Sequence, residues 1–294
     1  MQQKTEIAEG IKSFADLIKY KLSAAVTFSG VTGYFIFKAV PEKDLGLLIC
    51  GLFLTACGSA ALNQYSESEL DGIMKRTRQR PIPSRKMSGR QALVFATTLM
   101  VCGLCLLSLN GIIPVILGLT NIFLYNLAYT KLKRVTPLAL IPGSLVGAVP
   151  PLIGYFSAGG IRPDEGILIF SSFMFLWQIP HFWLIGMRYS DDYRSAGFRF
   201  NDLFRNSRNT RMVVFVWIVI STLLLIGLSI SGRLFYRELY YFLIPLNAIF
   251  ILLFHSFLFR TENEKNTRSA YILINSFGIA VMLFFIINSF LSAA

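Results

Sequence analysis

The sequence predicts an all-α, polytopic membrane protein. Of its 294 residues, 54% are hydrophobic and only 15% are charged, whereas soluble domains usually carry about a quarter charged residues. Apolar runs of about 20 residues, the length that crosses about 30 Å of hydrocarbon, recur along the chain. We expect these runs to be helices, because lipid offers no hydrogen-bond partners to a free backbone.

The apolar runs predict nine transmembrane helices around a central cavity, within a single domain that covers residues 1–294. Long polar loops follow the second and sixth runs, and shorter ones follow the fourth and eighth. This alternation predicts two four-helix halves plus a ninth helix. The expected spans are 22–40, 45–63, 91–109, 112–129, 138–157, 167–187, 212–231, 239–259 and 270–291.

The polar segment 1–21 is predicted to be a cytoplasmic N-terminal tail. It has mixed charge and no apolar core of a signal peptide, and it is short and acidic for a mitochondrial transit peptide. Most of the 28 lysines and arginines fall in this tail and in the loops after the even-numbered spans. The positive-inside rule then places the C-terminus outside a bacterial cytoplasmic membrane.

The net charge of +12 therefore gathers at the inner face of the membrane. A basic face of this kind attracts anionic lipid head groups and anionic substrates, so we expect the lipid bilayer as a partner and no nucleic acid. The alternative is that most of these charges only set the orientation of the helices in the membrane.

A polar motif begins at the end of the second span and reads NQYSESELDGIMKRTRQRP. Asn63, Glu67 and Asp71 are spaced by four residues, so on a helix they share one face. Their oxygens suit Mg²⁺, which also accepts phosphate ligands. Arg76 and Arg80 follow and could bind phosphate oxygens. The alternative is a helix end with unrelated surface charge.

A second cluster closes the fourth span, where Tyr129 and Lys133 are spaced by four and Arg134 follows. A phenol and an ammonium on one face could meet an anionic leaving group. Basic residues are expected at a cytoplasmic helix end in any case. A functional role for this cluster is therefore indicated only together with the other two polar clusters, which lie at the same face of the membrane.

The third cluster lies on the sixth span. Helical spacing places Trp177, His181, Arg188 and Asp192 on one stripe. A single histidine in a span can be a packing residue, but its stripe partners favour a functional role.

The fifth span contains Gly143 and Gly147 in a GxxxG pattern, followed by Pro150 and Pro151. The prolines predict a break in this helix. The pattern fits close helix packing and a site-shaping role about equally.

These motifs resemble the UbiA superfamily of intramembrane prenyltransferases. The specific parts are NQYSESELDGIMKRTRQRP, YNLAYTKLKRVTP with the following GAVPPLIGY, and WQIPHFW with DDYRSAG. The last of these is similar to the branch that acts on heme B rather than to the quinone-pathway members. The resemblance extends from Lys19 to about Phe277 and implies nine helices around a cavity that opens near the cytoplasmic face.

The resemblance implies Mg²⁺-dependent ionisation of farnesyl diphosphate, attack by a vinyl group of heme B and capture of water, which gives heme O. It assigns Asn63, Glu67, Asp71 and Asp192 to metal binding and catalysis, Tyr129 and Lys133 to catalysis, and Arg76, Arg80, Lys133, Arg134 and Arg188 to the diphosphate. From its depth and its stripe, we expect His181, together with Trp177, to contact the heme. Heme A synthase or a terminal oxidase assembly is a possible partner.

The chain departs from the family pattern in two places. Gln64 and Glu67 stand where many relatives have aspartate, and no second aspartate follows Asp192 at a spacing of four. One Mg²⁺ with basic residues is therefore the expected arrangement. The alternatives are a family member that prenylates an aromatic ring, and a transporter of an anionic amphiphile.

Overall fold

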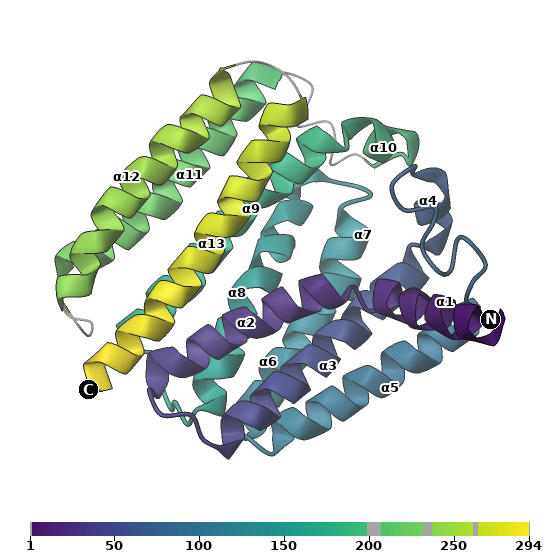
Figure 1. The fold of residues 1–294 in the computed structure, drawn as a ribbon, viewed down its shortest axis with the longest axis horizontal. Coiled ribbons are helices and arrows are strands. Elements are labelled where there is room, and N and C mark those ends of the chain that lie inside the picture. The colour runs from purple at the N-terminus through teal and green to yellow at the C-terminus, as the bar shows by residue number, and fades with distance from the viewer. Residues whose placement is uncertain (1, 199–206, 232–236, 261–263, 294) are drawn as a thin grey trace.

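The structure is a computed structural model that describes residues 2–198, 207–231, 237–260 and 264–293, and every regular element in this part of the chain is helical (Figure 1). The segment 199–206, part of the basic loop after the sixth predicted span, lies outside the described residues. The elements are α1 (Gln2–Leu17), α2 (Tyr20–Phe37), α3 (Lys43–Ser66), α4 (Ser68–Ile73), α5 (Gly89–Ser108), α6 (Ile112–Phe123), the π-helical turn η1 (Leu124–Tyr129), α7 (Thr130–Leu132), the 3₁₀ turn η2 (Pro137–Ala139), α8 (Leu140–Ser157), α9 (Glu165–Arg188), α10 (Ser190–Ser195), α11 (Ser207–Ser231), α12 (Arg237–Phe259) and α13 (Glu264–Ala293).

Each predicted span coincides with a helix, or with a helix and the turn next to it. Within the described residues, eight helices are long and apolar enough to cross a membrane, and α2 is not among them. Helix α2 carries several hydroxyl side chains, and three of them donate to its own backbone, as Thr27 does to the Ser23 carbonyl at 2.9 Å. The all-α membrane class is confirmed, and the count of nine crossings stays a prediction.

The helices form a closed ring of two halves. In the first half α2, α3, α5 and α6 pack in succession, and in the second α8, α9, α11 and α12 do the same. Helix α13 packs against α12, α9 and α2 and closes the ring (Figure 1). This is the predicted arrangement of two four-helix halves plus a ninth helix.

The two halves meet where α2 crosses α8 at very close range. A Cβ atom on Gly154 would collide with the Gly30 carbonyl, and one on Gly33 would collide with the Pro151 carbonyl. The predicted break at Pro150 and Pro151 is wrong, because α8 continues through both residues. Transmembrane helices tolerate proline where a neighbouring helix packs against the altered backbone, and here α2 provides that contact.

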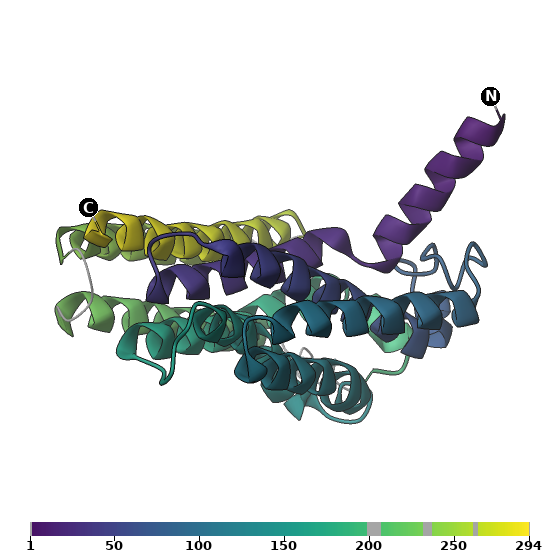
Figure 2. The same cartoon turned by 90° about the horizontal axis from the view of Figure 1, so that it is seen from below.

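Most of the N-terminal segment forms a helix. Helix α1 projects from the bundle at one end (Figure 2) and is separated from α2 by a joint at Lys19, whose φ of 47° lies in the left-handed region. The buried amide of Gln64 donates to the carbonyls of Asp16 at 2.7 Å and Leu17 at 2.9 Å. Gln64 therefore anchors this joint.

The outer surface of the ring is apolar. Large side chains such as Val94, Leu119 and Leu252 are exposed on α5, α6 and α12. A surface of this kind is typical of contact with lipid. Together with the long apolar helices, it identifies a multi-pass membrane protein.

The α2–α8 crossing makes a testable prediction. Gly154→Ala would force the two backbones apart and cost about 1–3 kcal/mol, as overpacking usually does. We expect a clear drop in the thermal unfolding temperature in detergent. Gly46→Ala on α3 is the matched control, since no atom lies within 4 Å of a Cβ built there. Equal unfolding temperatures for the two variants would contradict this account of the crossing.

Candidate active site

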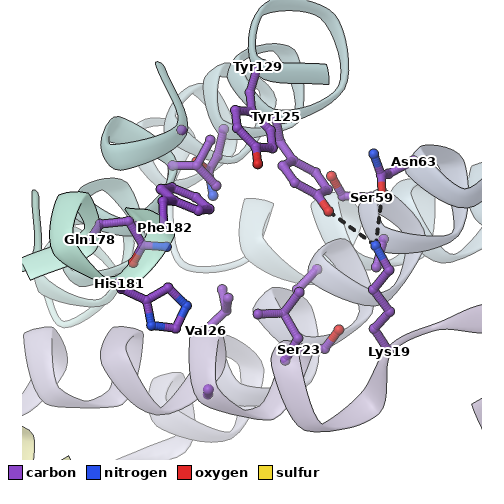
Figure 3. A pocket seen from close by; sticks show the side chains of 18 of the residues that line it. Lys19, Ser23, Val26, Ser59, Asn63, Tyr125, Tyr129, Gln178, His181 and Phe182 are labelled. Carbon is purple, nitrogen blue, oxygen red and sulfur yellow. Dashed lines mark hydrogen bonds between the residues drawn. The ribbon is translucent and has the colours of Figure 1, made fainter. Parts of the chain in front are cut away.

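A cavity of about 410 Å³ lies inside the ring at the end where α4, α10 and the α1–α2 joint meet. Its size is within the range of small-molecule sites. Side chains from α2, α3, η1, α8, α9 and α13 line it. Figure 3 shows Lys19 and Asn63 on one side of this space and Gln178, His181 and Phe182 on the other.

The first polar cluster is organised around Asn63 and Glu67. The Asn63 amide donates to Glu67 Oε2 at 2.9 Å and to Thr130 Oγ1 at 3.1 Å, and Lys133 Nζ donates to the same Glu67 oxygen at 2.8 Å. Both Asn63 and Glu67 are less than 5% exposed. The structure therefore brings Lys133 into direct contact with the Asn63 motif through Glu67.

Electrostatics keep Glu67 ionised. Burial is the largest influence and acts to raise the pKa of its carboxyl group, but the Lys133 ammonium, the Lys19 ammonium and the Asn63 amide together outweigh burial, and the pKa lies below its usual value. The other oxygen, Oε1, is buried and has no hydrogen-bond partner among the described residues. A buried anionic oxygen without a partner is costly, so this atom is available to a ligand.

Asp71 extends the same wall. Its carboxylate is 1% exposed and accepts from Arg80 Nη1 at 2.8 and 2.7 Å. The chain changes direction at Glu67, where φ is −111° and ψ is 7°, so Asn63 and Asp71 lie on two different helices. They nevertheless line one cavity with Glu67, as the spacing of four predicted.

Lys19 is a cavity residue that sequence reasoning missed. Its ammonium donates to Asn63 Oδ1 at 2.7 Å and to the Tyr125 hydroxyl at 3.4 Å (Figure 3). Burial, together with the charge of Arg80, lowers the pKa of Lys19 to about 7. Lys19 stands in a polar segment before the first span, where no spacing pattern connects it to the motif at Asn63.

An aromatic wall faces the polar cluster. The turn η1 places the rings of Tyr125 and Tyr129 in a stack with centroids 6.0 Å apart, and Tyr129 stacks on Phe182 at 5.4 Å. The Lys133 ammonium lies 5.1 Å from the centroid of Tyr129. The two tyrosines belong to a π-helical turn, and such turns are frequent at functional sites.

Only part of the third cluster lines the cavity. Trp177 and His181 stack at 5.0 Å and line the cavity, and Trp177 Nε1 donates to the Ile274 carbonyl at 2.9 Å. His181 Nδ1 is buried without a hydrogen-bond partner among the described residues.

The predicted stripe does not reach Arg188 and Asp192, which are not among the lining residues. Helix α9 ends at Arg188, and Tyr189 leaves the helical region with φ −118° and ψ 29°, so the spacing no longer applies to Asp192. The Arg188 guanidinium lies over the Tyr189 ring at 5.1 Å. Asp192 accepts hydrogen bonds from backbone N–H groups of the segment after α4.

Arg134 also lies outside the cavity lining. It is exposed, and its guanidinium donates to the Ser66 carbonyl at the C-terminus of α3 at 3.0 Å. A cation at this position stabilises the end of a helix. Of the predicted diphosphate residues, Arg76, Arg80 and Lys133 do line the cavity.

Charge is distributed unevenly around the cavity. The charged residues among the described lining all come from the first half of the chain, and they are Lys19, Glu67, Asp71, Arg76, Arg80 and Lys133. The second half contributes only uncharged side chains, which include Gln178, Phe182, Tyr193, Phe198, Tyr271 and Asn275. One wall therefore suits an anion, and the other suits a flat or apolar group.

Such a cavity suits an enzyme that takes a diphosphate ester with a long apolar tail from the bilayer, which is the class of intramembrane prenyltransferases. The chain belongs to the UbiA prenyltransferase family, whose model matches residues 24–285.

Among its relatives, the protoheme IX farnesyltransferase of Flavobacterium psychrophilum is 31% identical over 290 residues, which cover 95% of this chain and 94% of the relative. The protoheme IX farnesyltransferase of Geobacter sulfurreducens is 39% identical over 181 residues, 62% of this chain and 67% of the relative.

Solved structures agree on the fold. A UbiA homolog from Archaeoglobus fulgidus, bound to GPP and Mg²⁺, superposes with a TM-score of 0.76 over 96% of this chain and 100% of the other, at 13% identity. A digeranylgeranylglyceryl phosphate synthase superposes with a TM-score of 0.75 over 96% of this chain and 99% of the other, at 18% identity. At these identities the likeness supports the fold alone.

The lowered pKa of Lys19 makes a prediction about anion binding. Lys19 is protonated below its pKa of about 7, so the affinity for inorganic diphosphate should fall as the pH rises from 6 to 8.5. Lys19→Arg should keep its affinity at pH 8.5, because a guanidinium stays charged. Calorimetric titration of both proteins at each pH gives the measurement. Identical pH profiles would contradict a role for the Lys19 charge.

Proposed function

We propose that this protein transfers the farnesyl group of farnesyl diphosphate to a vinyl group of heme B, with addition of water, to give heme O and diphosphate. Membership of the UbiA family supports prenyl transfer. Relatives named protoheme IX farnesyltransferase, which match across nearly the whole chain, support the donor and the acceptor.

The uneven charge of the cavity carries the proposal. A prenyl donor brings a diphosphate, and a heme brings a flat apolar macrocycle. The first half supplies cations next to buried carboxylates, and the second half supplies rings and an imidazole. The donor would bind with its diphosphate against the first wall, and the acceptor would lie along α9.

Four cations would hold the diphosphate: Lys19, Arg76, Arg80 and Lys133. Negative charge develops on this group as the C–O bond breaks, and preorganised cations stabilise it most effectively in a site of low dielectric constant. Lys133 and Arg80 are held in place by their carboxylate partners, so little reorganisation is needed.

The residues present fit a divalent metal. Glu67 Oε1 is buried without a described partner, and the donors of Asn63, Glu67 and Asp71 are all oxygens, which Mg²⁺ prefers. No three acidic, histidine or cysteine side chains converge in the described part of the chain. That fits Mg²⁺, which usually binds one or two carboxylates together with water and substrate phosphate. Mg²⁺ held there would neutralise charge on the leaving diphosphate.

The aromatic wall would protect the farnesyl cation once the C–O electron pair has left with diphosphate. The stacked rings of Tyr125, Tyr129 and Phe182 present π faces that attract a cation. They also exclude water from the allylic carbon. The heme vinyl group then donates its π electrons to that carbon, and water captures the new cation and loses a proton.

His181 would contact the heme. It stacks on Trp177, lies 5.2 Å from the Tyr271 ring and has a buried ring nitrogen without a described partner. Imidazole is the commonest protein ligand for a metal centre of this kind. The metal-binding role of Asp192 and the diphosphate contacts of Arg134 and Arg188, which the family resemblance implies, stay predictions, because these residues do not line the cavity.

Membership of the family argues against a transporter, and the names of the relatives favour heme over an aromatic ring of the quinone pathway. The bacterial relatives suggest the inner membrane. We further propose that the N-terminus and the active site lie at the cytoplasmic side with the C-terminus outside, and that heme O passes to heme A synthase or to a terminal oxidase assembly.

The reaction can be tested directly. Membranes that contain the protein, incubated with heme B, farnesyl diphosphate and Mg²⁺, should yield heme O by mass spectrometry. Asp71→Asn should nearly abolish turnover with folding intact, because it removes an anion from the wall that would hold Mg²⁺ and diphosphate. Prenylation of a hydroxybenzoate or naphthoate with heme B left unreacted would overturn the proposed acceptor.

The role of His181 has its own test. His181→Ala should weaken heme B binding by about tenfold, as expected when an interaction of roughly 1.4 kcal/mol is lost, and leave the KM for farnesyl diphosphate unchanged. His255→Ala is the matched control, because His255 packs on Phe215 and Phe259 away from the cavity. Absorbance titration with heme B gives the measurement. Unchanged heme affinity in His181→Ala would remove the assignment.

A further inference from the structure

One carboxylate joins the two halves of the chain at the mouth of the cavity. Asp192 on α10 accepts from the backbone N–H of Lys75 at 3.1 Å through Oδ1 and from that of Arg76 at 3.0 Å through Oδ2. The two segments are 116 residues or more apart in sequence. Both oxygens of Asp192 are thus directed at consecutive N–H groups of the segment after α4.

The same segment presents Arg76 to the cavity. The Arg76 guanidinium lies 4.8 Å from the centroid of the Tyr189 ring, and Arg76 is a lining residue. Tyr189 sits at the junction between α9 and α10. The backbone and the side chain of Arg76 are therefore both held by residues 189–192, while its charge faces the site.

The other side of the segment is anchored separately. Thr77 Oγ1 donates to the Asp71 carbonyl at 3.0 Å, and the Arg80 N–H donates to the Thr77 carbonyl at 2.9 Å. Arg80 thus has its own support through Asp71. Among the described residues, no side chain of the first half holds Arg76 in this way, so its placement depends on α10.

We propose that Asp192 is a positioning residue that fixes Arg76 toward the diphosphate, and that it acts through the two backbone hydrogen bonds rather than as a metal ligand. This inference deepens the proposed function and rests on it. Three observations carry it: Asp192, unlike Asn63, Glu67 and Asp71, is absent from the cavity lining, its two oxygens accept backbone N–H groups of one segment, and those groups lie at or next to a cation that faces the site.

The first experiment needs no turnover. Asp192→Ala should speed amide hydrogen exchange in residues 74–78 and weaken the binding of inorganic diphosphate by about tenfold, since charge-assisted hydrogen bonds contribute this much. Asp192→Asn keeps one acceptor oxygen, so its exchange rate and its diphosphate affinity should lie between those of wild type and Asp192→Ala. Asp191→Ala is the matched control, because this neighbouring acid is exposed, and it should behave as wild type.

The second experiment separates positioning from metal binding. In the heme farnesylation assay, Asp192→Ala should raise the KM for farnesyl diphosphate with a smaller effect on kcat and leave the Mg²⁺ midpoint within about twofold of wild type. In an Arg76→Ala background, Asp192→Ala should raise the KM for farnesyl diphosphate by a further factor of less than about two, since the effects of residues that act through one another are not additive. A rise of about tenfold or more in the Mg²⁺ midpoint, or full additivity with Arg76→Ala, would overturn the inference.

The two proposals can fail separately. If wild-type protein leaves heme B unreacted while Asp192→Ala still alters exchange and diphosphate binding, the acceptor assignment fails and the role of Asp192 stands. If heme O forms and exchange in residues 74–78 is the same in Asp192→Ala as in wild type, the role of Asp192 fails and the proposed function stands.

Discussion

The cavity is built around buried carboxylates, and each of them requires a cation as a partner. Glu67 and Asp71 are each less than 5% exposed at the end of a membrane-embedded helix ring, where an unpaired carboxylate would be strongly destabilising. Each has a cation within 3 Å, Lys133 for Glu67 and Arg80 for Asp71. The Glu67 pair connects the end of α3 to the segment after α7, and the Asp71 pair holds the segment after α4 against α4. The charged wall is thus a binding surface whose ion pairs also hold together the segments that carry it.

The backbone is irregular where the site is built. Lys19 lies in the left-handed region, Glu67 interrupts the helix, η1 is a π-helical turn and Tyr189 separates α9 from α10. Membrane proteins tolerate such departures only where they are buried in protein or line a cavity. Each departure re-aims a side chain toward the site or toward its rim.

The sequence was enough to predict the helices and the first motif, because apolar run length and a spacing of four are local properties. Asn63, Glu67 and Asp71 converge as expected even though a bend separates them. Extrapolation along α9 failed at Tyr189, since a helix end is set by packing against distant segments. Lys19 could not be found from spacing, because tertiary structure alone brings the α1–α2 joint to Asn63. The uninterrupted α8 depends on α2 in the same way.

The separation of charge between the halves has an evolutionary consequence. All ionisable carboxylates and cations among the described lining residues come from Lys19 to Lys133, whereas the opposite wall is built by α8, α9, α10 and α13. Substitutions that reshape the second wall can therefore alter which molecule is accepted without disturbing the groups that activate the donor. An architecture divided in this way lets one leaving-group chemistry be retained while the acceptor diversifies, so lineages can diverge in product by changes confined to one half of the gene.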